Sequence, residues 1–213
     1  MTGDNDPSSS ASKHLQAGEE ALKRGDWAGA RAAFEQATAL REDAAAFEGL
    51  GRAAYWLDDL QATFGASERA YQLYRAAADP IGAARIATQL AMAYVDFQEE
   101  FAIGNGWLQR AASLLEGIDP CREHGWLAFY QAMFAVELDN DLAAALVYAE
   151  RAHALALQIG LFDLQMLTEA GMGYIQVRQG MVREGIQRLA KLPPRPWPVK
   201  SRTSPPPAPP AAS

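Results

Sequence analysis

The stretch from His14 to Leu40, HLQAGEEALKRGDWAGARAAFEQATAL, decides the fold of this chain of 213 residues. Apolar residues recur in it at helical spacing on both sides of the break at Gly25-Asp26, which predicts two helices joined by a tight turn. We expect Gly18 and Ala30 to face each other where the helices cross, because small side chains permit close approach, and Phe34 to fill the space between the helices.

The same pattern returns along the chain, which predicts an array of tandem repeats. Residues in the place of Gly18 follow at spacings of 33, 40, 42 and 40: Gly51, Ala91, Met133 and Gly173. In the second unit Thr63 and Ser67 stand where a small and an aromatic residue are expected. The pattern therefore predicts an all-α fold of about five helical hairpins, with longer helices in the later repeats and no sheet.

The first unit resembles a tetratricopeptide repeat (TPR) at the glycine of its first helix, at the turn and in the Ala–Phe–Ala series of its second helix. This resemblance covers residues 11–192 and implies a TPR-like α-solenoid. A standard TPR has a period of about 34 residues. The wider spacing here, together with segments such as NGWLQRAASLLEG, resembles the long arrays of MalT/LuxR-type bacterial transcription regulators. In those proteins the array commonly precedes a helix-turn-helix, which has no counterpart in this sequence.

The resemblance implies a non-catalytic scaffold, related to transcription regulation, that binds a peptide or protein segment in a concave groove lined by the first helices. Aromatic side chains, methionine and isolated arginines suit such a partner. The family pattern places these residues in the groove: Glu48, Arg52, Tyr55, Trp56, Arg85, Met92, Tyr130, Phe134, Glu137, Tyr174 and Arg178. A core position between repeats remains the alternative for Tyr55, Trp56 and Phe134. The alternative function is a small-molecule-sensing array of such a regulator, without its DNA-binding domain.

Both ends of the chain differ from the helical part. Residues 1–10 are small and polar without periodicity, and residues 193–213 contain nine prolines, so we expect disordered termini around the array at 11–192. The N-terminus lacks the apolar core of a signal peptide, and no apolar run approaches the ~20 residues of a membrane span. With Cys121 as the single cysteine, we expect a cytoplasmic protein that does not bind membranes.

The charge of the chain disfavours nucleic acid as a direct partner. The formal net charge is −7, and residues 193–213 hold three basic and no acidic residues. The preceding part therefore carries 16 basic against 26 acidic residues, a net charge of −10. A body this acidic repels phosphate backbones and anionic membranes.

The sequence predicts no enzyme, no metal site and no cofactor. It contains neither a GxSxG nucleophile motif nor a GxxxxGK[ST] phosphate loop. Cys121 and His124 lie three residues apart, but structural zinc requires four ligands and there is no second Cys/His pair. We expect an ordinary helix start there, and the alternative for Cys121 is a reactive thiol with a lowered pKa.

The last repeat is expected to lack a cap, since the prolines that follow it cannot continue the array. It would then fray and expose some of its methionines, which are Met166, Met172 and Met181. Exposed apolar surface of this kind predicts self-association through the last repeat.

Overall fold

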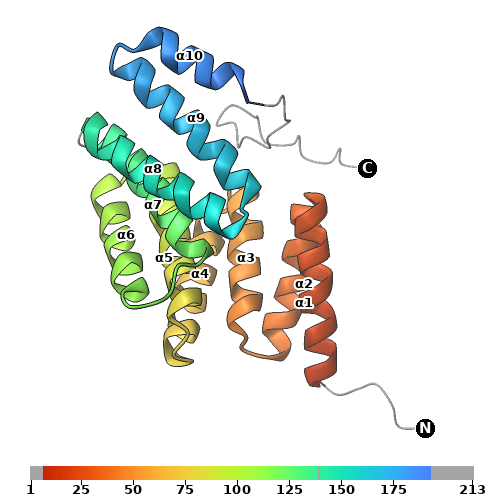
Figure 1. The fold of residues 1–213 in the computed structure, drawn as a ribbon. Coiled ribbons are helices and arrows are strands. Elements are labelled where there is room, and N and C mark those ends of the chain that lie inside the picture. Colours follow the sequence, from red (N-terminus) through yellow and green to blue (C-terminus); the bar gives the residue numbers. More distant parts are fainter. Residues whose placement is uncertain (1–6, 139, 193–213) are drawn as a thin grey trace.

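The computed structural model describes residues 7–138 and 140–192, and this part of the chain forms ten α-helices without a strand. Successive helices pair into five hairpins that stack in chain order (Figure 1). The helices are α1 (Pro7–Arg24), α2 (Trp27–Leu40), α3 (Ala44–Trp56), α4 (Leu60–Ala76), α5 (Pro80–Gln98), α6 (Phe101–Leu115), α7 (Arg122–Glu137), α8 (Leu142–Ile159), α9 (Phe162–Arg178) and α10 (Val182–Ala190). The predicted all-α repeat array is thereby confirmed.

Aspartates start five of these helices. Each accepts hydrogen bonds through its side chain from backbone N–H groups in the first turn, as Asp26 does from Gly29 at 2.9 Å. Such a cap contributes about 1 kcal/mol. The capping residues are Asp26, Asp43, Asp59, Asp79 and Asp141. The breaks between helices are therefore encoded locally in the sequence.

A residue with left-handed backbone marks the turn inside each hairpin. These residues have φ between 49° and 87° and follow one another at spacings of 33, 41, 41 and 40: Gly25, Asp58, Glu99, Asn140 and Gly180. Equivalent positions in different repeats can therefore be identified by their distance in sequence from this turn residue. Nine residues after the turn, the second helices carry these residues: Phe34, Ser67, Leu108, Ala149 and Leu189. Phe34, Ser67 and Ala149 lie beside the first helices of their own and the next hairpin, and Leu189 lies against Gly173 of α9.

The structure corrects the predicted register in the fourth repeat. The backbone N–H of Asp26 donates to the carbonyl five residues earlier, whereas those of Glu100 and Asp141 donate to carbonyls six residues earlier. The first helix therefore has one more residue before the turn, and the small position falls on Ala132, which is buried. Met133, predicted to hold that position, is 38% exposed.

Phe34 connects the first hairpin to the second. A Cβ atom on Gly18 would lie 2.7 Å from its ring, and a Cβ atom on Gly49 would lie closer still. The ring therefore fits between α1 and α3 because both helices have glycine at the contact. The sequence predicted that Gly18 faces Ala30. The three atoms nearest to a Cβ atom on Gly18 belong to the ring of Phe34.

Alanine fills much of the core, which lets the helices approach closely. The largest fully buried side chains are distributed along the array: Phe34, Ile86, Leu90, Leu108, Leu164 and Thr168. No helix in the described part of the chain is long and apolar enough to cross a membrane.

The first helix begins earlier than predicted. α1 starts at Pro7, so residues 7–10 are helical, although the sequence placed them in a disordered segment. The Ser12 hydroxyl donates to the Ser8 carbonyl at 3.0 Å and Ala11 is buried, which ties this turn to the array. The predicted disorder of residues 1–6 and 193–213 lies outside the described residues.

Candidate functional site

A hollow of about 340 Å³ lies between α3, α4 and α5 and extends to α7. We call it the Ser67 hollow, and its lining is Gly51, Arg52, Tyr55, Trp56, Thr63, Ser67, Gln89, Met92, Ala93 and Tyr130. It brings together five of the predicted groove residues: Arg52, Tyr55, Trp56, Met92 and Tyr130.

A second hollow of about 160 Å³ lies between α7, α8 and α9. We call it the Ala149 hollow, and its lining is Phe129, Ala132, Met133, Val136, Glu137, Ala149, Thr168, Gly171, Tyr174 and Ile175. Two predicted groove residues, Glu137 and Tyr174, belong to it. The rings of Phe129 and Tyr130 lie 5.3 Å apart on α7, with one lining each hollow, so the two hollows are neighbours.

Both hollows occur where the repeat has a small side chain nine residues after its turn. In the first hairpin Phe34 occupies this position and fills the space between Gly18 and Gly49. In the second and fourth hairpins the position holds Ser67 and Ala149, which line the two hollows. The hollows are therefore the spaces that an aromatic ring fills in the first repeat.

The aromatic residues of the Ser67 hollow are fixed by contacts between repeats. The Tyr55 hydroxyl donates to the Asp96 carboxylate and joins α3 to α5. The ring of Trp56 stacks on that of Trp27, with centroids 5.0 Å apart and planes 12° apart. Tyr55 and Trp56 thus pack between repeats and also line the hollow. A position between repeats and a position facing a partner are therefore compatible for these two residues.

Two phenols in this hollow are held in the neutral form. Burial, followed by the hydrogen bond and negative charge of Asp96, raises the pKa of Tyr55 well above its usual range. Burial and the charge of Asp96 raise the pKa of Tyr130 to about 12. An ordinary tyrosine is already protonated at neutral pH, so these shifts extend the pH range of the protonated hydroxyl groups upward.

Arg52 supplies positive charge to the Ser67 hollow. Its side chain is exposed, and no ion pair or hydrogen bond joins this side chain to another described residue. Arg31, in contrast, pairs with Glu35 and Asp59. A charged arginine beside aromatic rings can bind a carboxylate from another molecule.

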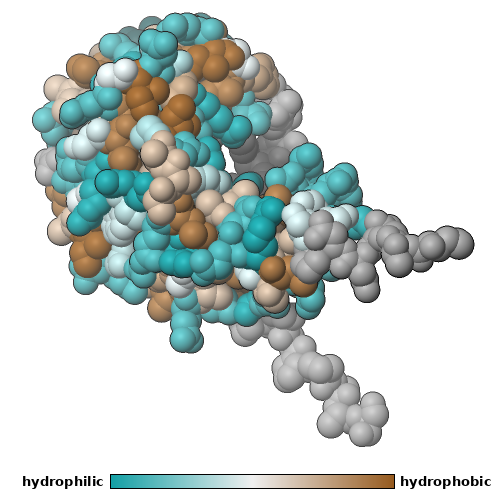
Figure 2. Space-filling view, turned by 90° about the horizontal axis from the view of Figure 1, so that it is seen from below, coloured by the Kyte–Doolittle hydropathy of each residue, from teal (hydrophilic) through white to brown (hydrophobic). Residues whose placement is uncertain are grey.

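Figure 2 shows hydrophobic and hydrophilic residues interspersed over the face seen from below, without one dominating apolar area.

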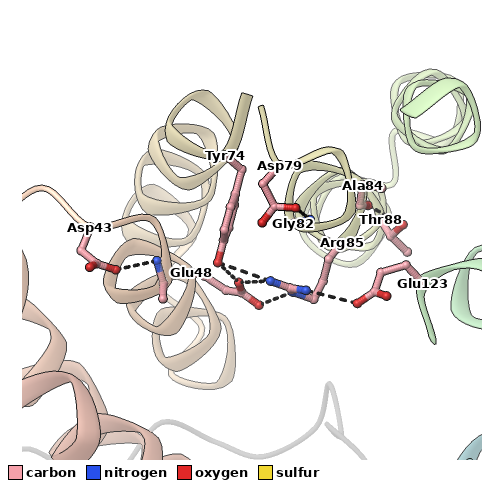
Figure 3. A network of polar contacts seen from close by, with 10 residues as sticks. Asp43, Glu48, Tyr74, Asp79, Gly82, Ala84, Arg85, Thr88 and Glu123 are labelled. Atoms are coloured by element: carbon pink, nitrogen blue, oxygen red, sulfur yellow. Dashed lines mark hydrogen bonds and ion pairs between the residues drawn. The ribbon is translucent and has the colours of Figure 1, made fainter. Parts of the chain in front are cut away.

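Glu48 and Arg85, predicted in the groove, bind each other instead (Figure 3). Arg85 donates from Nε to Glu48 at 2.8 Å and from Nη1 to Glu123 at 3.1 Å, and the Tyr74 hydroxyl donates to Glu48 at 2.8 Å. Burial lowers the pKa of Arg85, but the hydrogen bonds and charges of these carboxylates outweigh it and raise that pKa. This network joins α3, α4, α5 and α7. The side chains of Glu48 and Arg85 therefore already have partners within the chain.

Phe134 is a core residue, and its predicted place in the groove is wrong. It is 5% exposed, and its ring lies 5.9 Å from that of Phe101 and against Gly104. Arg178 lies beyond the Ala149 hollow, where it donates to the Tyr174 hydroxyl at 2.9 Å and to the Asn140 side chain at 2.8 Å.

Gln89, Phe129 and Gly171 line the hollows but were not among the predicted residues. Gln89 and Gly171 each precede the small residue of their first helix by two positions, as Gly49 does. Gly49 lies against the ring of Phe34, so a residue two positions before the small one forms the wall of the space beside the second helix. This spacing could have identified Gln89 and Gly171 from the sequence. Phe129 could not be found in this way, since it lies three residues before Ala132, whereas the offset of two gives Tyr130.

Cys121 lies at the start of α7, with Sγ 3.3 Å from Nδ1 of His124. Burial raises the pKa of the thiol, which opposes the alternative of a reactive thiolate at this helix start. Within the described ranges, no group of three or more His, Cys, Asp or Glu side chains could hold a metal ion.

No family model and no curated protein matches this chain. Among solved structures it is similar to pilF of Pseudomonas aeruginosa, with a TM-score of 0.68 and 14% identity over 89% of this chain and 79% of that chain. It is also similar to BtubC (BKLC) of P. vanneervenii, with a TM-score of 0.65 and 15% identity over 89% of this chain and 90% of that one. Both neighbours are TPR-type helical-repeat proteins, and this chain shares their fold.

Proposed function

We propose that this chain is a non-catalytic scaffold that binds a peptide or protein segment in the Ser67 hollow. The observation that supports the proposal is the gathering of Arg52, Tyr55, Trp56, Met92 and Tyr130 from three repeats around one hollow. Aromatic residues and arginine are the side chains that contribute most to binding energy at protein interfaces. A TPR-like fold agrees with such a role.

The chemistry of the hollow favours a segment with an acidic residue beside an apolar one. Arg52 would pair with the carboxylate, while Trp56 and Met92 would contact the apolar side chain. Tyr55 and Trp56 are already held by Asp96 and Trp27, so little side-chain freedom is lost on binding.

Selection of peptides from a random library against the full chain tests the proposal. Arg52→Glu should weaken the selected peptides at least tenfold, because it replaces attraction with repulsion. Arg151→Glu is the matched control, since Arg151 is an exposed arginine on α8 outside both hollows. Peptides that bind the native chain and the Arg52→Glu variant equally would contradict the assignment of the hollow.

A small-molecule sensor is the second candidate. The Ser67 hollow, at about 340 Å³, has the size of many ligand pockets, which span roughly 300–1,000 Å³. Its hydroxyl and amide groups, on Thr63, Ser67 and Gln89, could orient a polar ligand. Stabilisation of the native chain but not of the Arg52→Glu variant by a small molecule, with no peptide selected, would favour this function. A relation to MalT/LuxR-type regulators stays a prediction.

We also propose that the last repeat binds a second copy of this chain. Trp27, Arg31 and Phe34 contact the next hairpin, through Trp56, Asp59 and Gly49. At the equivalent positions of α10 stand Val182, Ile186 and Leu189, which are 49%, 56% and 37% exposed. A second copy of the chain carries the same stripe, so a two-fold arrangement would cover the stripes of both copies. Of the three methionines that were expected near the exposed end, Met181 is exposed, Met166 is half-buried and Met172 is buried.

A further inference from the structure

The Ala149 hollow differs chemically from the Ser67 hollow beside it. Its walls are formed by Phe129, Met133 and Val136 of α7 and by Gly171, Tyr174 and Ile175 of α9. At its base the Thr168 hydroxyl already donates to the Leu164 carbonyl at 2.8 Å and lies 2.9 Å from Nδ1 of His153. The Tyr174 hydroxyl accepts from Arg178, and Glu137 is exposed to solvent. The remaining lining is apolar, so an apolar group fits this hollow.

The first repeat shows what fits such a space. There the ring of Phe34 lies between Gly18 and Gly49. In the fourth repeat Ala149 stands in place of Phe34, Ala132 in place of Gly18, and Gly171 in place of Gly49. A Cβ atom on Gly171 would meet nothing within 4 Å, so the equivalent space is open.

The dimensions agree with one apolar side chain. The hollow has about 160 Å³, and an apolar protein cavity of roughly 150 Å³ accommodates a benzene ring. Met133 and Tyr174 at the rim are 38% and 46% exposed, so the space is accessible from outside. Methionine is flexible and can adjust to the shape of an incoming group.

We propose that the Ala149 hollow binds a phenylalanine-like side chain of the partner segment, which takes the place that Phe34 has in the first repeat. This inference rests on the proposed scaffold function and names the second anchor of the same ligand. The partner would place a charged residue at Arg52 and an aromatic residue in the Ala149 hollow, on the two sides of the pair Phe129 and Tyr130.

Toluene, which carries the same ring as phenylalanine, is the probe for this site. In the full chain labelled with ¹³C at the methionine methyl groups, Met133 reports on the Ala149 hollow and Met92 on the Ser67 hollow. Toluene should shift the Met133 signal saturably, with a Kd in the range of about 1 mM, and leave Met92 unchanged. Assignment of the two signals comes from Met133→Leu and Met92→Leu.

Ala149→Phe provides the decisive control, because it places a ring in the hollow from within the chain. Ala132 carries the Cβ atom that Gly18 lacks and crowds this ring, so circular dichroism must first show that the variant is folded. The folded variant should bind toluene at least tenfold more weakly at Met133. Gly171→Leu closes the same space from α9 and serves if Ala149→Phe does not fold. A native chain without a saturable Met133 shift, or a response that persists in both variants, would overturn the proposal. Peptide selection dependent on Arg52 is a separate measurement, so failure of the scaffold function is distinguishable from failure of this anchor.

Discussion

The phenyl ring of Phe34, on α2, lies directly against the backbone of Gly49, on α3. This contact joins the first hairpin (α1 and α2) to the second (α3 and α4). It depends on the absence of a side chain on α3, since a Cβ atom at that position would overlap the ring. The packing of Phe34 between the first two repeats therefore depends on this glycine.

Gly49→Ala should destabilise the chain by about 1–3 kcal/mol, because the added methyl group overpacks the contact with Phe34. Gly65→Ala is the matched control. Gly65 also lies within a helix, and its Cβ atom would meet nothing within 4 Å, so this change should stabilise by about 0.5–1 kcal/mol through helix propensity. Urea unfolding followed by circular dichroism measures both. Equal effects of the two changes would refute the role of the Phe34–Gly49 contact.

The first hairpin was predictable because its signals are local. The turn at Gly25, the cap at Asp26 and the large residue Phe34 lie within ten residues of one another. The fourth repeat was misplaced because one extra residue lies before its turn, and nothing in the composition of α7 announces it. A shift of one residue rotates a helix face by about 100°, which is why Met133 and Phe134 exchanged their expected environments.

The lining of the Ser67 hollow was predictable in part for the same reason. Arg52, Tyr55 and Trp56 lie in the second repeat, whose register was correct. The pairing of Arg85 with Glu48 and Glu123 joins residues 37 and 38 positions apart, on three different helices. Sequence spacing gives the face of each helix but not the distance between charges on different helices, so these residues were assigned to a partner.

Arg85→Leu should destabilise the array, since it leaves Glu48 and Glu123 without their cation. Their side chains are only 11% and 10% exposed. Loss of one partner from a buried ion pair costs about 3–5 kcal/mol, and solvent screening at the partly exposed Arg85 reduces the expected loss to about 1–2 kcal/mol.

Arg31→Leu is the control for this change. Arg31 is as exposed as Arg85, but its partners Glu35 and Asp59 are 49% and 33% exposed, so a loss of about 0–1 kcal/mol is expected. In the Arg85→Leu background, Glu123→Gln should recover part of the stability, because it removes one uncompensated charge. Additive effects of the two substitutions in a double-mutant cycle would show that Arg85 and Glu123 are not energetically coupled.

The stability of the chain should fall as the pH rises from about 10 to 12. Burial raises the pKa of Tyr130 to about 12 in the folded chain, whereas a tyrosine in an unfolded chain titrates near 10. In this interval the unfolded state loses a proton that the folded state keeps, so the free energy of unfolding decreases. Tyr130→Phe should make the decrease smaller by up to about 2 kcal/mol at pH 12. Urea unfolding at several pH values tests this, and an unchanged pH dependence in the variant would contradict it.

The exposed face of α10 predicts weak self-association of the chain. Val182, Ile186 and Leu189 form a stripe at helical spacing, and a two-fold arrangement would place the stripe of one copy against that of another. Because the helix has only nine residues, the interface is small, and we expect a Kd in the range of about 10–100 µM.

Ile186→Glu should give a monomer, because it places a charge in the centre of the stripe. Val147→Glu changes a side chain that is 64% exposed on α8, a helix that does not pack closely against α10, and it should leave the association intact. Sedimentation equilibrium of the full chain and both variants provides the measurement. If Ile186→Glu associates as strongly as the native chain, the stripe on α10 is not the contact. If the native chain remains monomeric at the highest attainable concentration, the terminal repeat is stable without a cover from a second copy, and the self-association predicted from its uncapped end is wrong.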